Sequence, residues 1–270
     1  MPELPEVETL RADLQHEIAG HAVVRADVPQ ARMTRGQGID EIVSRTSGQR
    51  IRSVGRRGKF LLLQLESEDT LLLHRGMSGN LFLESQADPG AKHRHLSLEL
   101  DDGRLLTLYD PRGFGVIQVL DASALTGRLA SLGPEPLGPE FTVAYLADRW
   151  AKRTASVKPL LLNQSTVAGL GNIYTDESLW AAELHPTRPA GTLSTEEIER
   201  LHGQIRATLS DAIEHRGTTF SDALDLYKQP GTYQYHLRIF HRPACPRCNG
   251  PIQQTQIANR GTSICPTCQR

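Results

Sequence analysis

The hydrophobic pattern of this 270-residue chain changes at residues 132–140, and that change most constrains what it can fold into. Before it, apolar residues recur in short runs such as "FLLLQL" (60–65) and "HLSLEL" (95–100). Leucines at alternate positions of the second run predict a strand with one buried face, and the Asp102-Gly103 pair after it predicts a hairpin turn. Residues up to about 130 therefore indicate an antiparallel β-sandwich or barrel.

Two segments have helical spacing instead. The first leads the strands and stops at Gly20, with apolar residues at Val7, Leu10, Leu14 and Ile18. The second lies beyond residue 140, where Ser194 and Glu197 fit a capping box before apolar positions over 198–213. The proline- and glycine-rich "LGPEPLGPE" (132–140) is the expected domain boundary.

The charge is balanced overall but unevenly distributed. The formal net charge is −1, yet residues 42–65 and 226–270 contain basic residues and no acid. Two such stretches favour a polyanion such as nucleic acid, although each alone could be a solvated face. The sequence has no apolar run that approaches a membrane span and no secretory n-region, so we expect a cytoplasmic protein.

All four cysteines lie in the last 26 residues, as "CPRC" and "CPTC". The C-x2-C-x16-C-x2-C spacing is typical of a structural zinc site, with Cys245, Cys248, Cys265 and Cys268 as ligands. A disulfide pair is disfavoured without an export signal, and a thioredoxin-type site would need a βαβ context. We therefore predict one structural Zn²⁺ ion as the cofactor.

The N-terminus, "MPELPEVETL", allows two interpretations. Pro2 and the acids that follow are typical of a helix start, because proline suits the first turn and carboxylates complement the helix dipole. Alternatively, removal of Met1 would make Pro2 a free secondary amine, partly unprotonated at cellular pH and able to act as a nucleophile. The terminus alone does not decide between them.

Three distant motifs together resemble the formamidopyrimidine-DNA glycosylase family: "PELPEVET", "GLGNIYTDESLW" and "RGTSICPTCQ". The resemblance runs over the whole chain. It implies an α+β fold, with an N-terminal helix and a two-layer antiparallel β-sandwich, then a helical domain with a helix–two-turn–helix and a zinc finger. We expect a catalytic domain over 1–131, a hinge over 132–141, a helical domain with the start of a lesion-capping loop over 142–225, and the loop end with the zinc-finger hairpin over 226–270.

The resemblance also implies an activity and its catalytic residues. The family excises oxidised purines, such as 8-oxoguanine and formamidopyrimidines, from duplex DNA and then cleaves the strand by β,δ-elimination. Pro2 matches the nucleophile that forms the Schiff base, and Glu3 matches the acid/base. Lys59 matches the lysine that assists β-elimination, and Arg260 the zinc-finger arginine that grips a phosphate.

Further residues match the family's DNA contacts. Three of them match the side chains that fill the stack when the damaged base leaves: Met77, Arg112 and Phe114. Asn172 matches the helix–two-turn–helix asparagine that binds the DNA backbone. The remaining expected DNA-binding residues are Glu6, for which helix capping is the alternative, and His74, His93, Arg153 and Lys158.

Several departures from the family pattern limit the resemblance. Gly113 stands where a second basic residue usually follows Arg112, and Asn163 replaces an aspartate. The segment before the zinc finger, "IFHRPACPRC", is about two residues shorter than usual. The stretch "SDALDLYKQPGTYQYH" (221–236) corresponds to the mobile loop that closes over the flipped base.

Two alternatives remain open at this stage. An endonuclease VIII-like enzyme would prefer oxidised pyrimidines on the same fold, although "PELPEVE" and Lys158 favour the purine branch. A non-catalytic zinc-finger DNA-binding protein would explain the cysteines but not the pairing of Pro2 with Glu3. In each case the expected partner is double-stranded DNA, damaged for the two enzymes, and the expected state is a monomer.

Overall fold

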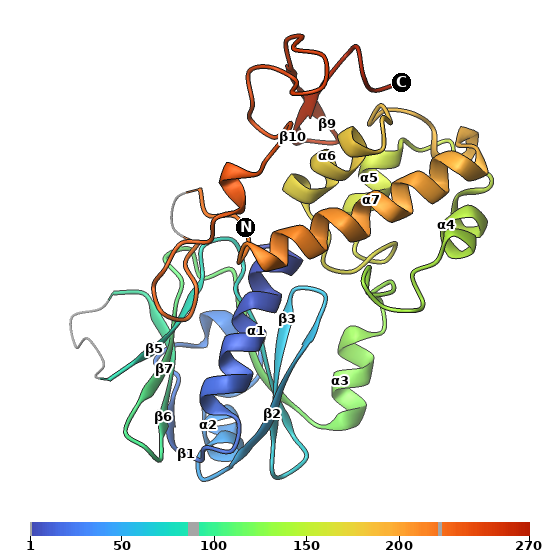
Figure 1. Ribbon diagram of the computed structural model, residues 1–270. Helices are drawn as coiled ribbons and strands as arrows, with labels where there is room; N and C mark the ends of the chain where they lie inside the picture. Colours follow the sequence, from blue (N-terminus) through green and yellow to red (C-terminus); the bar gives the residue numbers. More distant parts are fainter. Residues whose placement is uncertain (1, 86–91, 221–222) are drawn as a thin grey trace. The chain divides into compact units, whose positions relative to one another are not determined.

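The computed structural model describes residues 2–85, 92–220 and 223–270. The chain forms two compact units (Figure 1). Unit 1 contains residues 1–130 and 216–232, and unit 2 contains residues 131–215 and 233–270. Within the described ranges, no helix combines the length and apolar character needed to cross a bilayer.

Unit 1 contains two four-stranded antiparallel sheets. The first has the strand order β1-β6-β7-β5 and comprises β1 (Val23–Asp27), β5 (Asn80–Glu84), β6 (Arg94–Leu100) and β7 (Leu105–Tyr109). The second has the order β2-β3-β4-β8 and comprises β2 (Ile51–Arg57), β3 (Phe60–Leu65), β4 (Thr70–His74) and β8 (Val116–Leu120). The predicted turn at Asp102-Gly103 joins β6 to β7, and Gly103 has the positive φ of 85° that such turns favour.

The two sheets share one apolar core. Leucines of both, such as Leu98 of β6 and Leu63 of β3, are fully buried in a single cluster. Helix α1 (Leu4–Ile18) adds its predicted apolar face to that cluster. Three shorter helices complete this part of unit 1: η1 (Ala31–Met33), α2 (Ile39–Thr46) and α3 (Ala122–Leu129). The predicted helix and two-layer sandwich are confirmed.

Unit 1 also takes up a late segment of the chain. Leu226 is fully buried in the core of unit 1, and its carbonyl accepts a hydrogen bond from Leu83 N at 3.3 Å. The Asp225 carboxylate closes a turn by accepting the N–H groups of Tyr227 (2.9 Å) and Gln229 (2.8 Å). These contacts fix residues 225–229 of the expected lesion-capping loop (221–236), of which Ser221 and Asp222 lie outside the described residues.

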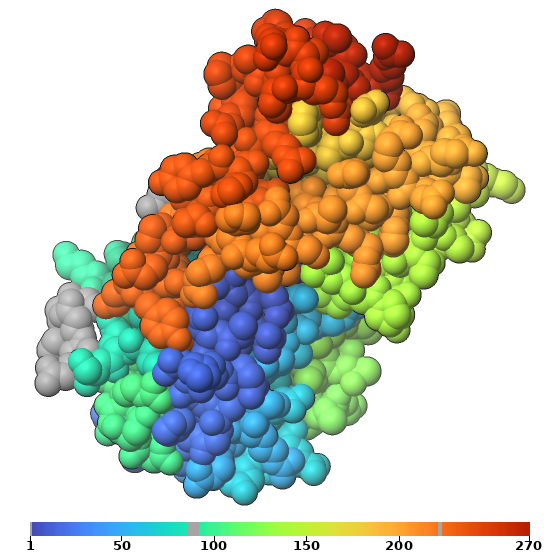
Figure 2. All heavy atoms as spheres, in the orientation of Figure 1, coloured from blue at the N-terminus to red at the C-terminus, as the bar shows by residue number. Residues whose placement is uncertain are grey.

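Unit 2 is helical and ends in a small hairpin. Its elements are α4 (Val143–Trp150), α5 (Val157–Leu162), α6 (Asn172–Ala181), η2 (Ala190–Thr192), α7 (Thr195–Glu214), η3 (Tyr233–Tyr235), β9 (Gln253–Ile257) and β10 (Arg260–Ile264). The predicted capping box opens α7, where Ser194 N donates to Glu197 Oε2 at 2.9 Å and Glu197 N donates to Ser194 Oγ at 3.3 Å. Figure 2 shows the red C-terminal segment packed directly against the yellow surface of α6.

Candidate functional site

The first turn of α1 is organised around Glu6. The Glu6 carboxylate accepts Glu3 N through Oε2 and Thr218 N through Oε1, each at 2.7 Å. Pro2 and Glu3 precede the helix and are buried, with Glu3 only 3% exposed. Glu6 therefore fixes the backbone of the predicted catalytic terminus, and its two bonds support the capping interpretation over a DNA contact.

Lys59 lies in the turn between β2 and β3, close to α1 in the fold. Glu8 of α1 accepts Arg56 Nε at 2.8 Å, and Arg56 Nη1 donates to the carbonyl of Gly58 at 2.9 Å. These two hydrogen bonds connect the turn that contains Lys59 to α1, the helix that begins after Glu3. The sequence predicted Lys59 and the terminus separately, and the α1–β2 packing holds their backbones in one part of unit 1.

His74, at the end of β4, is uncharged at neutral pH. Burial, reinforced by the positive charge of Lys59, lowers the pKa of His74 to about 4. Gly76 N donates to His74 Nδ1 at 2.9 Å, so the single proton of the neutral ring lies on Nε2. His74 can therefore donate one hydrogen bond to a phosphate but cannot add positive charge.

The three predicted stack-filling residues lie on two adjoining loops of unit 1. Met77 is 42% exposed and Phe114 is 46% exposed, and the guanidinium of Arg112 lies 4.7 Å from the centre of the Phe114 ring. Ser78 Oγ donates to Asp110 Oδ1 at 2.6 Å, which joins the loop of Met77 to that of Arg112. Large side chains this exposed are outside the core, as stack-filling groups must be.

His93 and Arg153 are exposed, and neither side chain forms a hydrogen bond or ion pair with another of the described residues. His93 lies just before β6 with a positive φ of 69°, and Arg153 follows α4. Their assignment to DNA contacts stays a prediction.

The two-turn segment before α6 is held together by Gln164. Its Nε2 donates to Leu170 O at 2.8 Å and its Oε1 accepts Gly169 N at 2.9 Å. Asn163, where the family resemblance leads us to expect an aspartate, accepts a hydrogen bond from Ser165 N through Oδ1 at 2.9 Å. An amide oxygen makes this bond as a carboxylate would, so the turn is retained without the charge.

The structure contradicts the prediction that Lys158 contacts DNA. Its side chain is fully buried, and Nζ donates to Asp176 Oδ1 (2.6 Å), Thr262 Oγ1 (2.8 Å) and Gly261 O (3.0 Å). A lysine committed in this way does not present a DNA contact, because an ammonium is buried only when its donors are paired. It holds the hairpin that carries Arg260 against α6.

Helix α6 fixes the C-terminal hairpin at further points. Asp176 Oδ2 accepts Ser263 N at 3.0 Å, and Asn172 Nδ2 donates to Gly261 O at 2.9 Å. Burial raises the pKa of Asp176 to about 6, so it is still ionised against Lys158 at neutral pH. The carboxylate of the neighbouring Glu177 accepts hydrogen bonds from the N–H groups of residues 238, 239 and 240 at 2.8–2.9 Å, which anchors the segment before the zinc finger.

The four cysteines fit one zinc ion. Their sulfurs all lie within 4.8 Å of one another, with Cys245 and Cys268 3.9 Å apart and Cys248 and Cys265 3.5 Å apart. Zinc–sulfur bonds of about 2.3 Å place the corners of a tetrahedron about 3.8 Å apart. The indole N–H of Trp180 in α6 points to Cys245 Sγ at 3.3 Å, so the zinc site is also joined to α6. All four ligand positions are filled by thiols, as a structural site requires.

Acids from other parts of the chain neutralise several basic residues of the two acid-free stretches. In the first, Arg45 pairs with Asp69 at 2.7 Å and Arg56 with Glu8 at 2.8 Å. In the second, Lys228 pairs with Glu84 at 2.7 Å, whereas Arg260 is exposed and forms no ion pair within the described parts of the chain. The expected binding surface for a polyanion therefore comprises fewer basic residues than the sequence suggests, and Arg260 is one of them.

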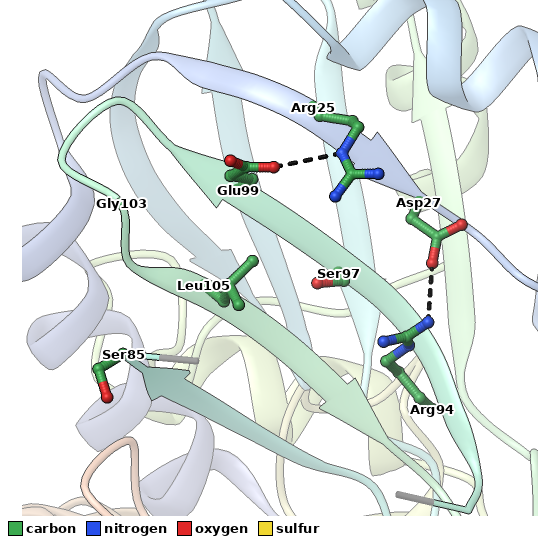
Figure 3. Close-up of a pocket in the computed structure, with 8 residues that line it drawn as sticks. All are labelled: Arg25, Asp27, Ser85, Arg94, Ser97, Glu99, Gly103 and Leu105. Atoms are coloured by element: carbon green, nitrogen blue, oxygen red, sulfur yellow. Dashed lines mark hydrogen bonds and ion pairs between the residues drawn. The ribbon is translucent and has the colours of Figure 1, made fainter. Parts of the chain in front are cut away.

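A shallow depression on the β1-β6-β7-β5 sheet is a poor anion site. Arg25 pairs with Glu99 at 3.2 Å and Arg94 with Asp27 at 3.1 Å, as Figure 3 shows. Each arginine that lines the depression is neutralised within it, which leaves no positive charge for a phosphate.

Sequence reasoning missed the side chains that organise these groups. Asp110 is fully buried below the Arg112 loop, and Asp176 and Glu177 lie inside the motif "GLGNIYTDESLW" without having been singled out. The sequence carried a signal for Asp176 and Glu177, because two adjacent acids in a segment without a basic residue need partners from elsewhere if they are buried. Asp110 had a weaker signal in its position before Pro111 at a turn.

Three family descriptions match successive parts of the chain. Residues 1–117 match the formamidopyrimidine-DNA glycosylase N-terminal domain, and residues 132–223 match the H2TH domain of the same glycosylase. Residues 244–270 match the zinc finger found in FPG and IleRS.

Whole-chain relatives agree with these matches. Formamidopyrimidine-DNA glycosylases of Roseiflexus sp. and Herpetosiphon aurantiacus are 43% and 40% identical to this chain, with full coverage of both chains in each case. A solved structure of a Lactococcus lactis FPG mutant with a Fapy-dG containing DNA superimposes with a TM-score of 0.94 at 33% identity, covering all of both chains. The wild-type Lactococcus lactis FPG with an oxidized pyrimidine containing DNA gives 0.92 at the same identity, again over both full chains. The chain belongs to the formamidopyrimidine-DNA glycosylase family.

Proposed function

We propose that this protein excises oxidised purines, such as 8-oxoguanine and formamidopyrimidines, from duplex DNA and then cleaves the strand at the resulting abasic site. The observation that carries the proposal is the first turn of α1, where Glu6 fixes the backbone next to Pro2 and Glu3. The structures of Lactococcus lactis FPG with Fapy-dG and with abasic-site DNA, at about one-third identity, support the same substrates for this chain.

The proposed chemistry uses the amine that removal of Met1 exposes. The Pro2 nitrogen attacks C1′ and gives up its proton, while the damaged base leaves with its bonding electrons and takes up a proton. The nitrogen lone pair then breaks the bond from C1′ to the ring oxygen, Glu3 protonates that oxygen, and an iminium remains at C1′. The iminium then acidifies C2′, so loss of a C2′ proton expels the 3′ phosphate and a second elimination expels the 5′ phosphate. Lys59 and Arg260 contact the phosphates that leave.

The DNA contacts that we propose are made by predicted residues that are exposed or half-buried. We assign Met77, Arg112 and Phe114 to filling the stack, His74 and Asn172 to backbone hydrogen bonds, and His93 and Arg153 to outer phosphate contacts. Because the substrate is DNA, we also propose that the protein acts in the cytoplasm. We further propose that it acts as a monomer.

Borohydride trapping tests the proposal. The protein is incubated with duplexes that carry one 8-oxoguanine opposite cytosine, one abasic site, or one oxidised pyrimidine, and the adduct is mapped by peptide mass spectrometry. We expect a covalent adduct on Pro2 with the first two duplexes. Glu3→Gln keeps the amine and should still trap the abasic site while losing base excision, which separates the acid from the nucleophile.

A second candidate is a preference for oxidised pyrimidines. The wild-type Lactococcus lactis FPG structure favours it, because that relative is in complex with an oxidized pyrimidine containing DNA. Trapping on the pyrimidine duplex and the abasic duplex, without trapping on 8-oxoguanine, would select this candidate. A protein that binds DNA, has lost Met1 and traps on none of the three is a binding module without catalysis.

A further inference from the structure

Two arginines outside every recognised motif reach the loop that carries Arg112 and Phe114. Arg32 Nη2 donates to Arg112 O at 2.6 Å, and Arg35 Nη2 donates to Phe114 O at 3.0 Å and to Gly115 O at 3.1 Å. Both arginines flank the buried Met33 of η1, which anchors their backbone in the core of unit 1. Their guanidinium groups thus bond the carbonyl side of the loop about 80 residues further along the chain.

The amide side of the same loop is bonded from below by Asp110. Its carboxylate accepts the N–H groups of Arg112 (3.2 Å), Phe114 (2.8 Å) and Gly115 (3.0 Å). The loop backbone is therefore held by an acid through its N–H groups and by two bases through its carbonyl groups. The side chains of Arg112 and Phe114 are exposed, with the Arg112 guanidinium over the Phe114 ring.

Gly113 explains how Arg32 gets so close. This residue has a φ of +60°, and a Cβ at this position would overlap Arg32 Nε and lie 2.6 Å from Arg32 Cδ. A side chain at position 113 would clash with Arg32 in its present side-chain conformation. The absence of a basic side chain at position 113 is thus paired with a guanidinium supplied from η1.

We propose that Arg32 and Arg35 are positioning residues that hold this loop in the shape needed to fill the DNA stack when the damaged base leaves. The proposal rests on the proposed function. A loop that is ordered before DNA binds does not lose backbone entropy at the moment of base flipping, when unstacking already opposes the reaction. Side chains that act within a stack need such support, because small errors of position weaken their contacts.

The test compares methionine variants, which keep an aliphatic stem but lose the donors and the charge. Arg32→Met and Arg35→Met are measured beside Arg25→Met, whose exposed side chain pairs with Glu99 on the sheet face of Figure 3. One readout is single-turnover excision of 8-oxoguanine from a duplex. The second is cleavage of a single-stranded abasic oligonucleotide, in which no stacked partner strand has to be filled.

We expect each loop variant to slow duplex excision by about tenfold, the effect of losing one charged hydrogen bond, while single-stranded cleavage stays within about twofold of wild type. Arg25→Met should change neither rate. Arg32→Lys keeps a charge and one donor and should recover part of the loss. Equal losses on both substrates, or no loss on the duplex, would overturn the proposal.

The insertion step can also be followed without catalysis. A 2-aminopurine placed beside a tetrahydrofuran abasic analogue reports the filling of the stack on binding. If the wild-type protein excises no lesion, the proposed function fails, and the loop proposal is then decided by this fluorescence signal. A signal equal in wild type, Arg32→Met and Arg35→Met would overturn it.

Discussion

Two predicted DNA-contacting arginines, Arg112 and Arg260, are positioned by opposite means. The loop of Arg112 is held by partly exposed arginines and one buried acid, all bonded to its backbone. The hairpin of Arg260 is held by a fully buried Lys158–Asp176 pair and by a zinc site. Surface hydrogen bonds can be lost singly at small cost, whereas a buried pair or a metal fails as a whole. The hairpin is therefore the more fragile support.

The largest effect is expected from the zinc site. Cys265→Ser replaces a buried ligand, and structural zinc contributes on the order of 10 kcal/mol to folding of small zinc domains. We expect zinc content and binding to abasic-analogue DNA to fall together, while the α7 helix remains. Thr255→Ser, on the exposed part of β9, is the matched control. Full DNA affinity in a zinc-free protein would contradict the structural role of the hairpin.

The buried pair comes next. Lys158→Met leaves Asp176 without its cation, and breaking a buried pair from one side costs about 3–5 kcal/mol of unfolding free energy. Denaturant unfolding measures this loss, and hydrogen exchange at the amides of β10 locates it. The double variant Lys158→Met/Asp176→Leu should recover much of the stability. If the single variant were as stable as wild type, the pair would not support the hairpin.

The acid below the Arg112 loop should have an intermediate effect. Asp110→Asn removes one acceptor oxygen and introduces an amide donor where several N–H groups converge, a loss of about 1–3 kcal/mol. We expect slower duplex excision with nearly unchanged cleavage of single-stranded abasic DNA. Asp121→Asn, at the start of α3, is a control because it caps a helix on another part of unit 1. If Asp110→Asn lowered the unfolding free energy more than Lys158→Met does, the ranking of the two supports would be reversed.

The most gradual effect, spread over more than two pH units, is a pH dependence at His74. Its pKa is about 4 when folded and near 6.5 when unfolded, so between these values the unfolded chain binds more protons. The unfolding free energy should fall as the pH drops from 6.5 towards 4, by at most about 1.4 kcal/mol per pH unit. His74→Gln should flatten this slope in urea titrations at several pH values, and His16→Gln, at an exposed position, should not. An unchanged slope in His74→Gln would exclude His74 as its source.

Local patterns in the sequence predicted much of this molecule. The alternating leucines of β6, the capping box of α7 and the cysteine spacing each depend on residues close together in the chain, and all three were confirmed. Long-range pairings were not predictable in this way. Lys158 reads as a surface residue until Asp176 and Thr262 are brought to it, and Arg32 meets Arg112 only because η1 lies below that loop.

The return of residues 216–232 into unit 1 has a consequence for how the protein can be made and divided. The chain passes between the units at residues 130/131, 215/216 and 232/233, so no single cut separates them. A fragment that ends near residue 130 would leave an unfilled place in its core, where Leu226 belongs. During synthesis, the first unit to begin emerging is also one that has to wait for a residue near the other end of the chain before its core is complete.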